Sequence, residues 1–371
     1  MKILIIDTYY PGFLQSFWRT HRSLVGKSYS LQLKALLGEC FGTSDYYSYH
    51  LNQLGHPTYD IIANDQISQL QWAKEHSLQV KSSGLLARLQ MLPFLHRFLG
   101  RPSWVQTIVL AQVKAAHPDV VYLQDLSILN TTTLTEIKQY SKLLIGQIAC
   151  PLPGLDHLKP YDLILTSFPH YVKQFTDLGI KSEYFKIGFE TRLIKRIGQL
   201  ERRYDVAFVG SFSPYHSEGT SILEQLAKNI PVHVWGTGLE YLSPTSPLRA
   251  NYHGEAWGKT MYAVLAQSKI VINRHIGVSG KYANNMRLYE STGMGAMLIT
   301  DAKANLAKLF IPGKEVVSYR NSQELVSAVQ YYLDHPAKRM AIARAGQKRT
   351  VHEHSYSLRM QELITIIAKY L

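Results

Sequence analysis

The sequence predicts an α/β protein of two domains, each built on a mostly parallel, doubly wound sheet. Three observations support this fold class. At 371 residues the chain is long for one compact core. Short apolar runs alternate with helix-patterned segments in both halves, as strands and crossover helices do. Between Ile270 and Asp301 a strand, a glycine-containing turn, a helix and a second strand follow one another.

The first half contains five apolar runs with the length of strands. They cover Lys2–Asp7, Tyr59–Ala63, Asp119–Gln124, Leu143–Gln147 and Tyr161–Thr166. Helices are expected over Ser30–Tyr49 and Val105–Ala116, and after Pro169 as far as Leu178. The strand pattern lapses between Lys186 and Arg202, and the basic run Arg192–Arg203 is the expected hinge.

A second α/β series follows the hinge. Its expected strands are Tyr204–Val209, Val232–Trp235, Ile270–Ile272, Ala296–Thr300 and Glu315–Ser318, and its expected helices are Ile222–Lys228, Thr260–Gln267, Asn285–Thr292, Gln323–Leu333, Ala337–Gln347 and Ser357–Leu371. The predicted domains are therefore residues 1–195, residues 196–352, and a C-terminal helix in residues 353–371 that packs back on the first domain.

Composition and cysteine content indicate a globular cytoplasmic protein. Hydrophobic residues make up 46% of the chain and charged residues 18%. Cys40 and Cys150 are far apart and form no CxxC spacing, which favours a reducing compartment without structural zinc. The apolar N-terminal stretch is shorter than that of a secretory signal, and no run of about 18 apolar residues predicts a membrane span.

The positive charge is densest in residues 81–104. The chain has a formal net charge of +13, and no Asp or Glu occurs between Glu75 and Asp119. Arginines, leucines and aromatic residues alternate there at helical spacing. This pattern fits either a core-facing helix pair with a solvated basic side, or a peripheral contact between residues 81–104 and an anionic membrane. No nucleic-acid motif accompanies the charge, so we expect no nucleic-acid partner.

Polar residues gather around the helix in the Ile270–Asp301 unit. Asn284 or Asn285 offers an N-cap, and Asn284, Arg287 and Glu290 share one helical face. Cations and unpaired helix N–H groups suit a diphosphate, and a carboxylate one turn further along suits a ribose diol. The alternative is that Arg287 and Glu290 only pair with each other on the helix surface.

Several segments of the second half resemble the carboxy-terminal domain of the CgeB-like (spore maturation protein-like) glycosyltransferases, which are related to glycosyltransferase family four. The similar segments are Tyr204–Ser211, Asn284–Glu290, Gly293–Asp301, Glu324–Leu325, His335–Pro336 and His354–Arg359. The resemblance implies a GT-B enzyme with two Rossmann-like domains facing across a cleft. It also implies a nucleotide-sugar donor held by the second domain, an acceptor held by the first, and no metal.

The resemblance also suggests roles for individual residues of the second domain. Glu290 matches the ribose-binding glutamate of the family. Lys281, Arg287, Gly210 and Ser211 fall where the donor phosphates are held. The base is expected near Gly236, Thr237 and Gly238, with His253–Tyr262 nearby. The related family has a second glutamate where this chain has Tyr282, so the stereochemical outcome stays open.

Further candidates come from residues that follow strands or turns. Asp7, Asp125 and His157 of the first domain are candidate catalytic groups, because an inverting transferase needs a base near the acceptor hydroxyl. In the second domain, His275, Asn284 and Asn285 are further candidates for donor contact. The chain contains no Asp-x-Asp sequence, and we expect neither a metal nor a cofactor.

The predicted function is transfer of a sugar from a nucleoside-diphosphate-sugar donor to an unidentified acceptor, which could be a glycan, a lipid-linked sugar or a protein. Two alternatives share the same donor site. A GT-B epimerase would rearrange the nucleotide sugar without an acceptor. A binding protein would hold the nucleotide sugar without reaction, as the missing first glutamate would allow. The expected location is the cytoplasm, with the membrane face as the alternative.

Overall fold

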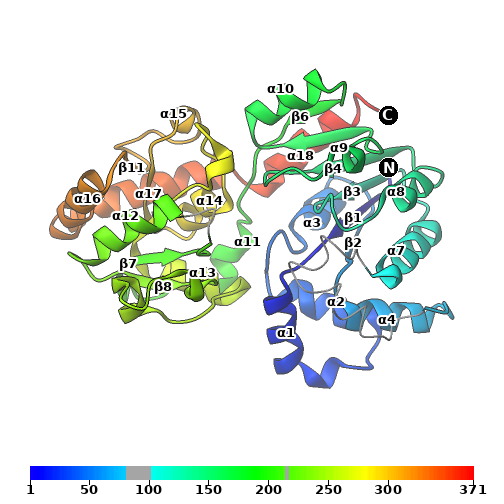
Figure 1. The fold of residues 1–371 in the computed structure, drawn as a ribbon, viewed down its shortest axis with the longest axis horizontal. Helices are drawn as coiled ribbons and strands as arrows, with labels where there is room; N and C mark the ends of the chain where they lie inside the picture. The colour runs from blue at the N-terminus through cyan, green and yellow to red at the C-terminus, as the bar shows by residue number, and fades with distance from the viewer. Residues whose placement is uncertain (81–101, 214–216) are drawn as a thin grey trace. The chain divides into compact units, whose positions relative to one another are not determined.

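The computed structural model describes residues 1–80, 102–213 and 217–371. The chain forms two compact units (Figure 1). Unit 1 comprises Met1–Phe185 together with Met360–Leu371, and unit 2 comprises Lys186–Arg359. The predicted division after residue 195 lies inside α11 (Arg192–Ile197), a helix of unit 2. Each unit is described below by itself.

Unit 1 is built on a sheet of six strands in the order β2-β1-β3-β4-β5-β6, and all its pairings are parallel. The strands are β1 (Ile3–Asp7), β2 (Thr58–Ile62), β3 (Val120–Leu123), β4 (Leu143–Gln147), β5 (Leu163–Thr166) and β6 (Ser182–Tyr184). All five predicted strands are confirmed, whereas the short and polar β6 was not predicted. The strand order reverses between β1 and β3, which is where open α/β sheets form a crevice at their carboxyl edge.

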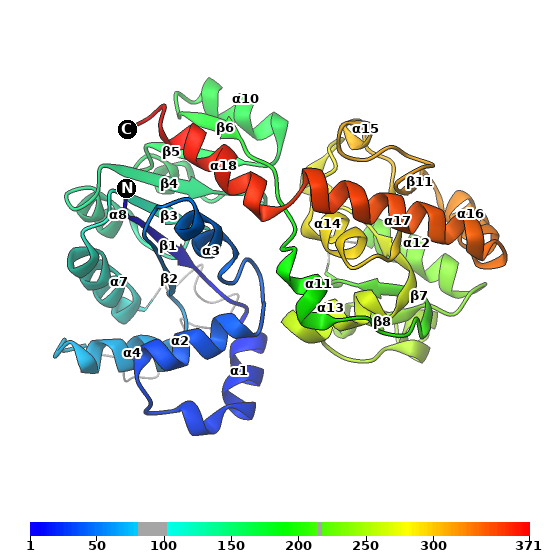
Figure 2. The ribbon, with the colours of Figure 1, turned by 180° about the vertical axis from the view of Figure 1, so that it is seen from behind.

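The helices of unit 1 flank this sheet (Figure 1). They are α1 (Pro11–Thr20), α2 (Tyr29–Gly38), α3 (Tyr46–Gln53), α4 (Gln66–Glu75), α7 (Ser103–Ala116), α8 (Thr131–Ile137), α9 (Leu155–Leu158) and α10 (Pro169–Asp177), with a 3₁₀ turn, η1, over Arg22–Leu24. The end of α18 (Tyr356–Ile367) also belongs to this unit, and Lys369 and Tyr370 just beyond it bind Glu183 of β6 (Figure 2).

The prediction of one continuous helix over Ser30–Tyr49 is wrong. The structure has α2 and α3 with a break between them, where Cys40, Gly42 and Ser44 adopt φ angles of 61°, 58° and 47°. Left-handed residues cannot continue a right-handed helix. The break places Thr43 beside the carboxyl edge of the sheet, where it contacts Asp7.

Unit 2 is built on a five-stranded parallel sheet in the order β11-β10-β9-β7-β8. The strands are β7 (Tyr204–Val209), β8 (His233–Trp235), β9 (Ser268–Asn273), β10 (Met297–Asp301) and β11 (Val317–Tyr319). The strand order reverses between β7 and β9. The fold prediction of two parallel-sheet α/β domains is confirmed.

The helices of unit 2 include those predicted from the sequence. They are α11, α12 (Ser217–Ala227), α13 (Gly258–Ala266), α14 (Met286–Gly293), α15 (Leu306–Leu309), α16 (Ser322–Asp334), α17 (Pro336–Glu353) and the start of α18, with 3₁₀ turns η3 (Leu239–Tyr241), η4 (Pro247–Asn251) and η5 (Gly277–Ser279). Phe208 of β7 and Ile272 of β9 share a core with Leu226 of α12 and Leu325 of α16. Because strand side chains alternate, the neighbouring strand residues face the opposite side of the sheet.

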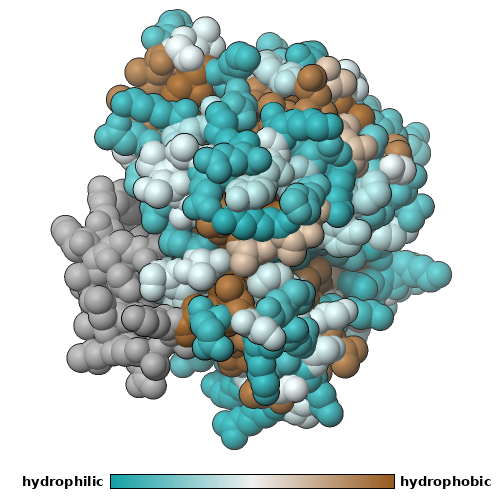
Figure 3. All heavy atoms as spheres, turned by 90° about the vertical axis from the view of Figure 1, so that its right-hand side faces the viewer, coloured by the Kyte–Doolittle hydropathy of each residue, from teal (hydrophilic) through white to brown (hydrophobic). Residues whose placement is uncertain are grey.

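The basic segment at 81–104 lies almost wholly outside the described residues. Of its described part, Trp104 in α7 is only 1% exposed, so this aromatic residue belongs to the core and not to a membrane contact. The face of the molecule drawn in Figure 3 is mainly hydrophilic, with apolar residues in small separate groups. Within the described part of the chain, no helix has the length and apolar character needed to cross a bilayer.

Two turns of unit 2 touch each other through their backbones. Gly210 N–H donates to Trp235 O at 3.0 Å, and Phe212 N–H donates to Thr237 O at 2.8 Å. Gly238 has a φ of +87°, and a Cβ added there would lie 2.0 Å from Phe212 O. The turn after β8 therefore supports the turn after β7, and glycine is required for this close approach.

We expect Gly238→Ala to destabilise the protein more than Gly254→Ala. Both residues have a left-handed φ, +87° and +86°, but a Cβ at Gly254 meets no atom within 4 Å. Gly254→Ala should therefore cost only the left-handed strain of about 1–2 kcal/mol, whereas Gly238→Ala must also move the Phe212 backbone and should cost roughly 2 kcal/mol more. Urea unfolding of both variants measures the difference, and equal losses would show that the two turns are not closely packed.

Candidate functional site

Arg287 of α14 reaches the carboxyl end of β7 in unit 2. Its Nε donates to Val209 O at 3.1 Å, and its Nη1 lies 2.7 Å from Glu290 Oε2. The two side chains are 16% and 6% exposed, so the predicted pair forms, but inside the unit and not on the helix surface. Among the described residues, Arg287 Nη2 has no hydrogen-bond acceptor. This nitrogen is therefore available to bind an anion.

Glu290 joins two helices of unit 2. Its Oε1 accepts a hydrogen bond from the Tyr262 hydroxyl of α13 at 3.2 Å, while Oε2 accepts from Arg287. Both oxygens of this buried carboxylate are thus hydrogen-bonded, although each has a second lone pair. Glu290 can accept a further hydrogen bond from a ligand hydroxyl only if that hydroxyl enters beside Arg287 or Tyr262.

Ser211, in the turn after β7, presents a backbone donor to a ligand. The N–H of Gly210 is bonded to Trp235 O and is not free to bind an anion, so the predicted place of Gly210 beside the donor phosphates stays a prediction. Within the described part of unit 2, the Ser211 N–H has no acceptor. The Ser211 hydroxyl accepts from Thr237 Oγ1 at 2.9 Å, which connects the two predicted residues directly. Of Gly210 and Ser211, the donors left for a ligand are therefore the Ser211 N–H and the Ser211 hydroxyl.

Arg274, the first residue after β9, is a buried cation at the same edge. Its Nη2 donates to Ser211 O at 3.1 Å, and its Nη1 donates to Thr220 Oγ1 at 2.9 Å. The guanidinium lies over the rings of Phe208 and Phe212, at 5.1 and 5.5 Å from their centroids. Burial lowers the pKa of Arg274 to about 10, so the side chain stays charged at neutral pH.

Sequence analysis did not single out Arg274. Its position directly after a predicted strand was a usable signal, since residues there line the carboxyl edge of a parallel sheet. The contacts with Ser211 and Thr220 come from segments more than 50 residues away and could not be read from local spacing.

Asn285 and Asn284 hold the backbone at the start of α14. Asn285 is the N-cap, because its side chain accepts from Leu288 N–H, and its amide donates to Asn273 Oδ1 and Arg274 O. Asn284 precedes the helix, is buried, and accepts from the Tyr289 hydroxyl at 3.4 Å. Asn285 thus positions α14 against β9, whereas Asn284 contacts Tyr289 of α14 itself.

His275 and Lys281 lie apart from the turn after β7. The His275 Nδ1 is 2.6 Å from Asp301 Oδ1, and the side chain is only 1% exposed. Burial alone would raise the pKa of Asp301, but His275 and Lys303 outweigh it and hold that pKa below its usual value. Lys281 is exposed over the Tyr282 ring. Neither of these two predicted donor-contact residues contacts Ser211 or Arg287 in the described structure.

The carboxyl edge of unit 1 brings Asp7 and Asp125 together. Asp7 ends β1, and its Oδ1 accepts from Thr8 N–H at 2.7 Å. The Thr8 hydroxyl donates to Asp125 Oδ2 at 3.0 Å, and Asp125 Oδ1 accepts from the N–H and hydroxyl of Ser127. Threonine 8 thus bridges two of the three predicted catalytic residues at the strand-order reversal of the sheet.

The carboxyl of Asp7 titrates near neutral pH. Burial and the nearby Asp125 carboxylate raise its pKa to about 7, although hydrogen bonds from Thr8 and Thr43 oppose the rise. Asp7 as a whole is partly exposed, whereas its carboxyl group is enclosed by protein atoms. Among the described residues, no Lys or Arg pairs with Asp7. A carboxyl with a pKa near neutrality suits general-base chemistry.

A polar network that the sequence did not predict extends this edge. Thr43 donates to Gln124 Oε1 at 2.6 Å and to Asp7 Oδ2 at 3.3 Å. Two buried tyrosine hydroxyls, those of Tyr47 and Tyr122, donate to Gln147 Oε1. Gln124 and Gln147 directly follow or end strands, which was the signal available in the sequence.

His157 stands apart from these residues. It lies on α9, its Nδ1 is buried without a hydrogen-bond partner, and it contacts neither Asp7 nor Asp125 in the described structure. Across residues 1–80, 102–213 and 217–371, no group of three or more His, Cys, Asp and Glu side chains is arranged to hold a metal ion. Metal independence remains a prediction.

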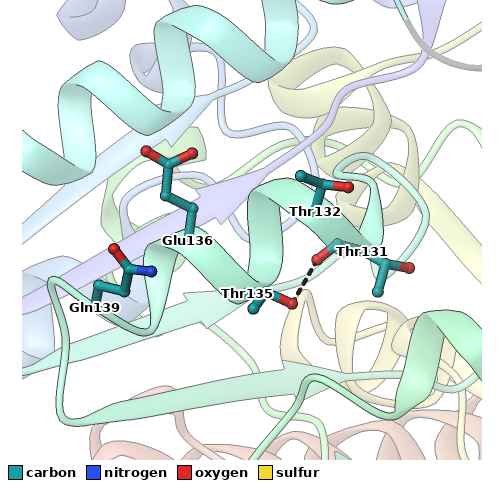
Figure 4. Close-up of a pocket in the computed structure, with 5 residues that line it drawn as sticks. All are labelled: Thr131, Thr132, Thr135, Glu136 and Gln139. Carbon is teal, nitrogen blue, oxygen red and sulfur yellow. Dashed lines mark hydrogen bonds between the residues drawn. The ribbon is translucent and has the colours of Figure 1, made fainter.

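A surface hollow of about 500 Å³ lies against α8, lined by Thr131, Thr132, Thr135, Glu136 and Gln139 (Figure 4). One helix and the turn after it supply all of these side chains, and Glu136 is already paired with Lys114 at 2.7 Å. Ligand sites are usually enclosed by several elements. The carboxyl edges of the two sheets are therefore better candidates for the functional site than this hollow.

Residues 219–365 match the family of glycosyl transferase-like domains. The matched region covers most of unit 2, including α14 and all of β9 and β10. No curated protein sequence is significantly similar to the chain. The match bears out the prediction of a transferase enzyme, and it does so at the level of glycosyltransferases in general, without distinguishing the CgeB-like group.

Solved structures share the fold over the full chain. A glycosyltransferase from Rickettsia africae has a TM-score of 0.59 at 11% identity, covering 100% of this chain and 98% of that one. Anabaena HepE, in complex with UDP-glucose, has a TM-score of 0.58 at 12% identity and full coverage of both chains. Sucrose-phosphate synthase from Thermosynechococcus elongatus has a TM-score of 0.59 at 10% identity, covering 100% and 98%. These likenesses confirm the GT-B fold.

The raised pKa of Asp7 predicts a pH-dependent stability. The folded pKa, about 7, exceeds the ordinary value of 3.8, so this contribution to stability is complete below about pH 4 and is lost as pH rises to about 7. The substitution Asp7→Asn removes the titrating carboxyl and therefore removes this pH-dependent loss of stability. Relative to the natural protein, the unfolding free energy of the variant should rise by roughly 2 kcal/mol between pH 5 and pH 8.

Urea unfolding at the two pH values provides the measurement. Asp156→Asn is the matched control, because Asp156 is an exposed carboxylate paired with Lys159 and its pKa is lowered, so it stays ionised across this range. If the unfolding free energy relative to the natural protein rose between pH 5 and pH 8 in both variants, or in neither, the result would contradict a buried Asp7 carboxyl with a raised pKa.

Proposed function

We propose that the protein is a metal-independent glycosyltransferase that moves a sugar from a nucleoside-diphosphate-sugar donor to an acceptor hydroxyl. Unit 2 binds the donor and unit 1 binds the acceptor. The observation that carries the proposal is the group of anion-binding donors at the carboxyl edge of unit 2, where Arg287 Nη2 and Ser211 N–H have no partner in the described structure and Arg274 adds a buried positive charge.

The donor diphosphate is the natural ligand of these groups. When the bond between the sugar and the phosphate breaks, negative charge develops on the leaving phosphate. Arg287 Nη2 and Ser211 N–H would stabilise that charge by hydrogen bonds held in place by the fold, and Arg274 would add its field. Glu290 is proposed to accept a ribose hydroxyl, and Thr237 to border the nucleotide. HepE, which shares the fold, binds UDP-glucose.

Asp7 is proposed to take the proton of the acceptor hydroxyl. Its pKa of about 7 allows ionisation at neutral pH while leaving the carboxylate basic enough to accept a proton. Asp125, fixed by Thr8 and Ser127, would hold the same or a neighbouring hydroxyl. We also propose membership of the CgeB-like group and a location in the cytoplasm, with the reaction at the membrane face.

The donor site is tested by removing the buried pair without leaving an unpaired charge. The double variant Arg287→Met with Glu290→Gln should weaken UDP and UDP-glucose binding by about tenfold or more, since a hydrogen bond to a charged group contributes about 1.5–3 kcal/mol. Calorimetric titration measures the affinity. Lys314→Ala is the control, because this exposed lysine precedes β11 at the amino end of the sheet.

A loss of affinity in the control as large as that in the double variant would indicate non-specific attraction by the positive chain. Unchanged affinity in a folded double variant would remove Arg287 and Glu290 from the donor site.

The acceptor side is tested with Asp7→Asn. The variant should bind UDP-glucose with the same affinity but release UDP at least 100-fold more slowly when acceptor is present, because proton transfer contributes about 10²–10⁴-fold in rate. In the natural protein, the rate should rise with pH through the pKa of about 7. His157→Ala, which alters a residue that contacts neither Asp7 nor Asp125 in the described structure, is the control.

The configuration of the product separates two roles for Asp7. If Asp7 acts as the base, the configuration at the anomeric carbon of the transferred sugar should be inverted in the product. If that configuration is retained, the donor phosphate would take the proton of the acceptor hydroxyl, and Asp7 would only bind the acceptor. Full activity of Asp7→Asn would remove the residue from both roles.

A further inference from the structure

The turn between α1 and α2 exposes basic and aliphatic side chains together. We define the α1–α2 surface as Arg19, Arg22, Val25, Lys27, Leu31 and Lys34, all exposed. The two aliphatic residues, Val25 and Leu31, are each 54% exposed. Figure 1 shows this turn at the end of unit 1 farthest from α10. Leu31 and Lys34 share one face of α2, and Lys27 lies in the turn just before the N-cap Ser28.

The charge of this surface has one sign. From Thr8 to Gly38 the sequence contains no Asp or Glu and has four cations, Arg19, Arg22, Lys27 and Lys34. The neighbouring carboxylate is Glu75 at the end of α4, which accepts from Tyr29 N–H and from Gln71. Glu39, the C-cap of α2, is a second carboxylate near these four cations, and the α1–α2 surface keeps a net positive charge.

The turn is held in one conformation from inside the unit. The Gln32 amide is buried and donates to Leu24 O at 3.0 Å and Lys27 O at 3.1 Å. On α1, the Trp18 indole donates to the buried Asp65 carboxyl at 2.7 Å. Two contacts from the interior therefore fix the backbone on both sides of Val25. An exposed aliphatic side chain on a fixed turn loses little conformational entropy when a partner covers it.

We propose that the α1–α2 surface docks onto an anionic lipid bilayer. Basic side chains attract a negatively charged surface, and aliphatic side chains between them enter the boundary between headgroups and acyl chains. A nucleic acid would match the charge but would gain little from exposed valine and leucine, since nucleic-acid sites combine basic residues with aromatic or hydrogen-bonding ones. The inference deepens the proposed location of the reaction at the membrane face, and it uses no residue of 81–101.

Vesicle sedimentation of the full chain tests the proposal. The probes are vesicles of phosphatidylcholine alone and of equimolar phosphatidylcholine and phosphatidylglycerol. The protein should bind the anionic vesicles and not the neutral ones, and binding should fall with added salt. Arg22→Glu with Lys27→Glu should lower the partition coefficient at least about tenfold, because each basic residue near an anionic surface contributes severalfold.

Two further variants identify the cause of any loss. Arg344→Glu with Lys348→Glu changes the net charge by the same amount on the exposed side of α17 and should alter binding less than about twofold if the contact is local. Val25→Ser with Leu31→Ser should weaken binding while leaving its salt dependence unchanged. Circular dichroism confirms that each variant is folded.

Four results would overturn the proposal. The first is absence of binding to the anionic vesicles. The second is an equal loss in the α17 variant and the α1–α2 variant, which would show that only net charge matters. The third is unchanged vesicle binding after both the charge and the aliphatic substitutions. The fourth is binding of the protein to single-stranded RNA that the Arg22→Glu with Lys27→Glu substitutions weaken as much as they weaken vesicle binding.

Discussion

The buried carboxylate of Glu290 joins the elements that form the carboxyl edge of unit 2. It accepts hydrogen bonds from Arg287 on its own helix and from Tyr262 on α13, and Arg287 in turn binds the last carbonyl of β7. Burying an ion pair removes two charges from water, and the pair is tolerated only when hydrogen bonds satisfy both groups. Two of these contacts, with the Val209 carbonyl and the Glu290 carboxylate, hold the guanidinium still. Its remaining nitrogen is then oriented before any ligand arrives.

The two units share a topology but differ in the charge at their carboxyl edges. In unit 2, the buried Arg274 and the partly buried Arg287 supply two cations, which bind the carbonyls of Ser211 and Val209. In unit 1, the corresponding reversal of strand order brings Asp7 and Asp125 together, and burial raises the pKa of Asp7. A positive edge favours an anionic ligand such as a diphosphate. An edge with a weakly acidic carboxyl favours a neutral hydroxyl that can donate a hydrogen bond.

Some features of the candidate site could be predicted from the sequence because they depend on local spacing. Arg287 and Glu290 are three residues apart on a helix, so their pairing follows from helix geometry. Asn285 is an N-cap because an amide before an apolar helix accepts from the first turn. His275 could not be placed in this way. Its partner, Asp301, lies at the end of the next strand. The contact with Asp301 holds the His275 imidazole in the interior of unit 2.

The break between α2 and α3 is a feature of the fold that local sequence patterns could not predict. Helical patterning over Ser30–Tyr49 predicts one helix, but tertiary packing holds Cys40 and Ser44 in left-handed conformations that their residue types seldom adopt. The break delivers Thr43 to Asp7 and Gln124. Local propensity contributes a few tenths of a kcal/mol per residue, and packing of the surrounding core easily outweighs it.

The sequence by itself determined that the chain has two parallel-sheet domains, because strand and helix periods and glycine positions are local properties. It also determined which strand ends carry chemically useful side chains. Only the tertiary structure decided which of those side chains meet. Thr8 links Asp7 to Asp125, and Arg274 links β9 to the turn after β7, across 117 and 63 residues of sequence. Contacts at such separations depend on strand order and on burial, and no local pattern encodes either one.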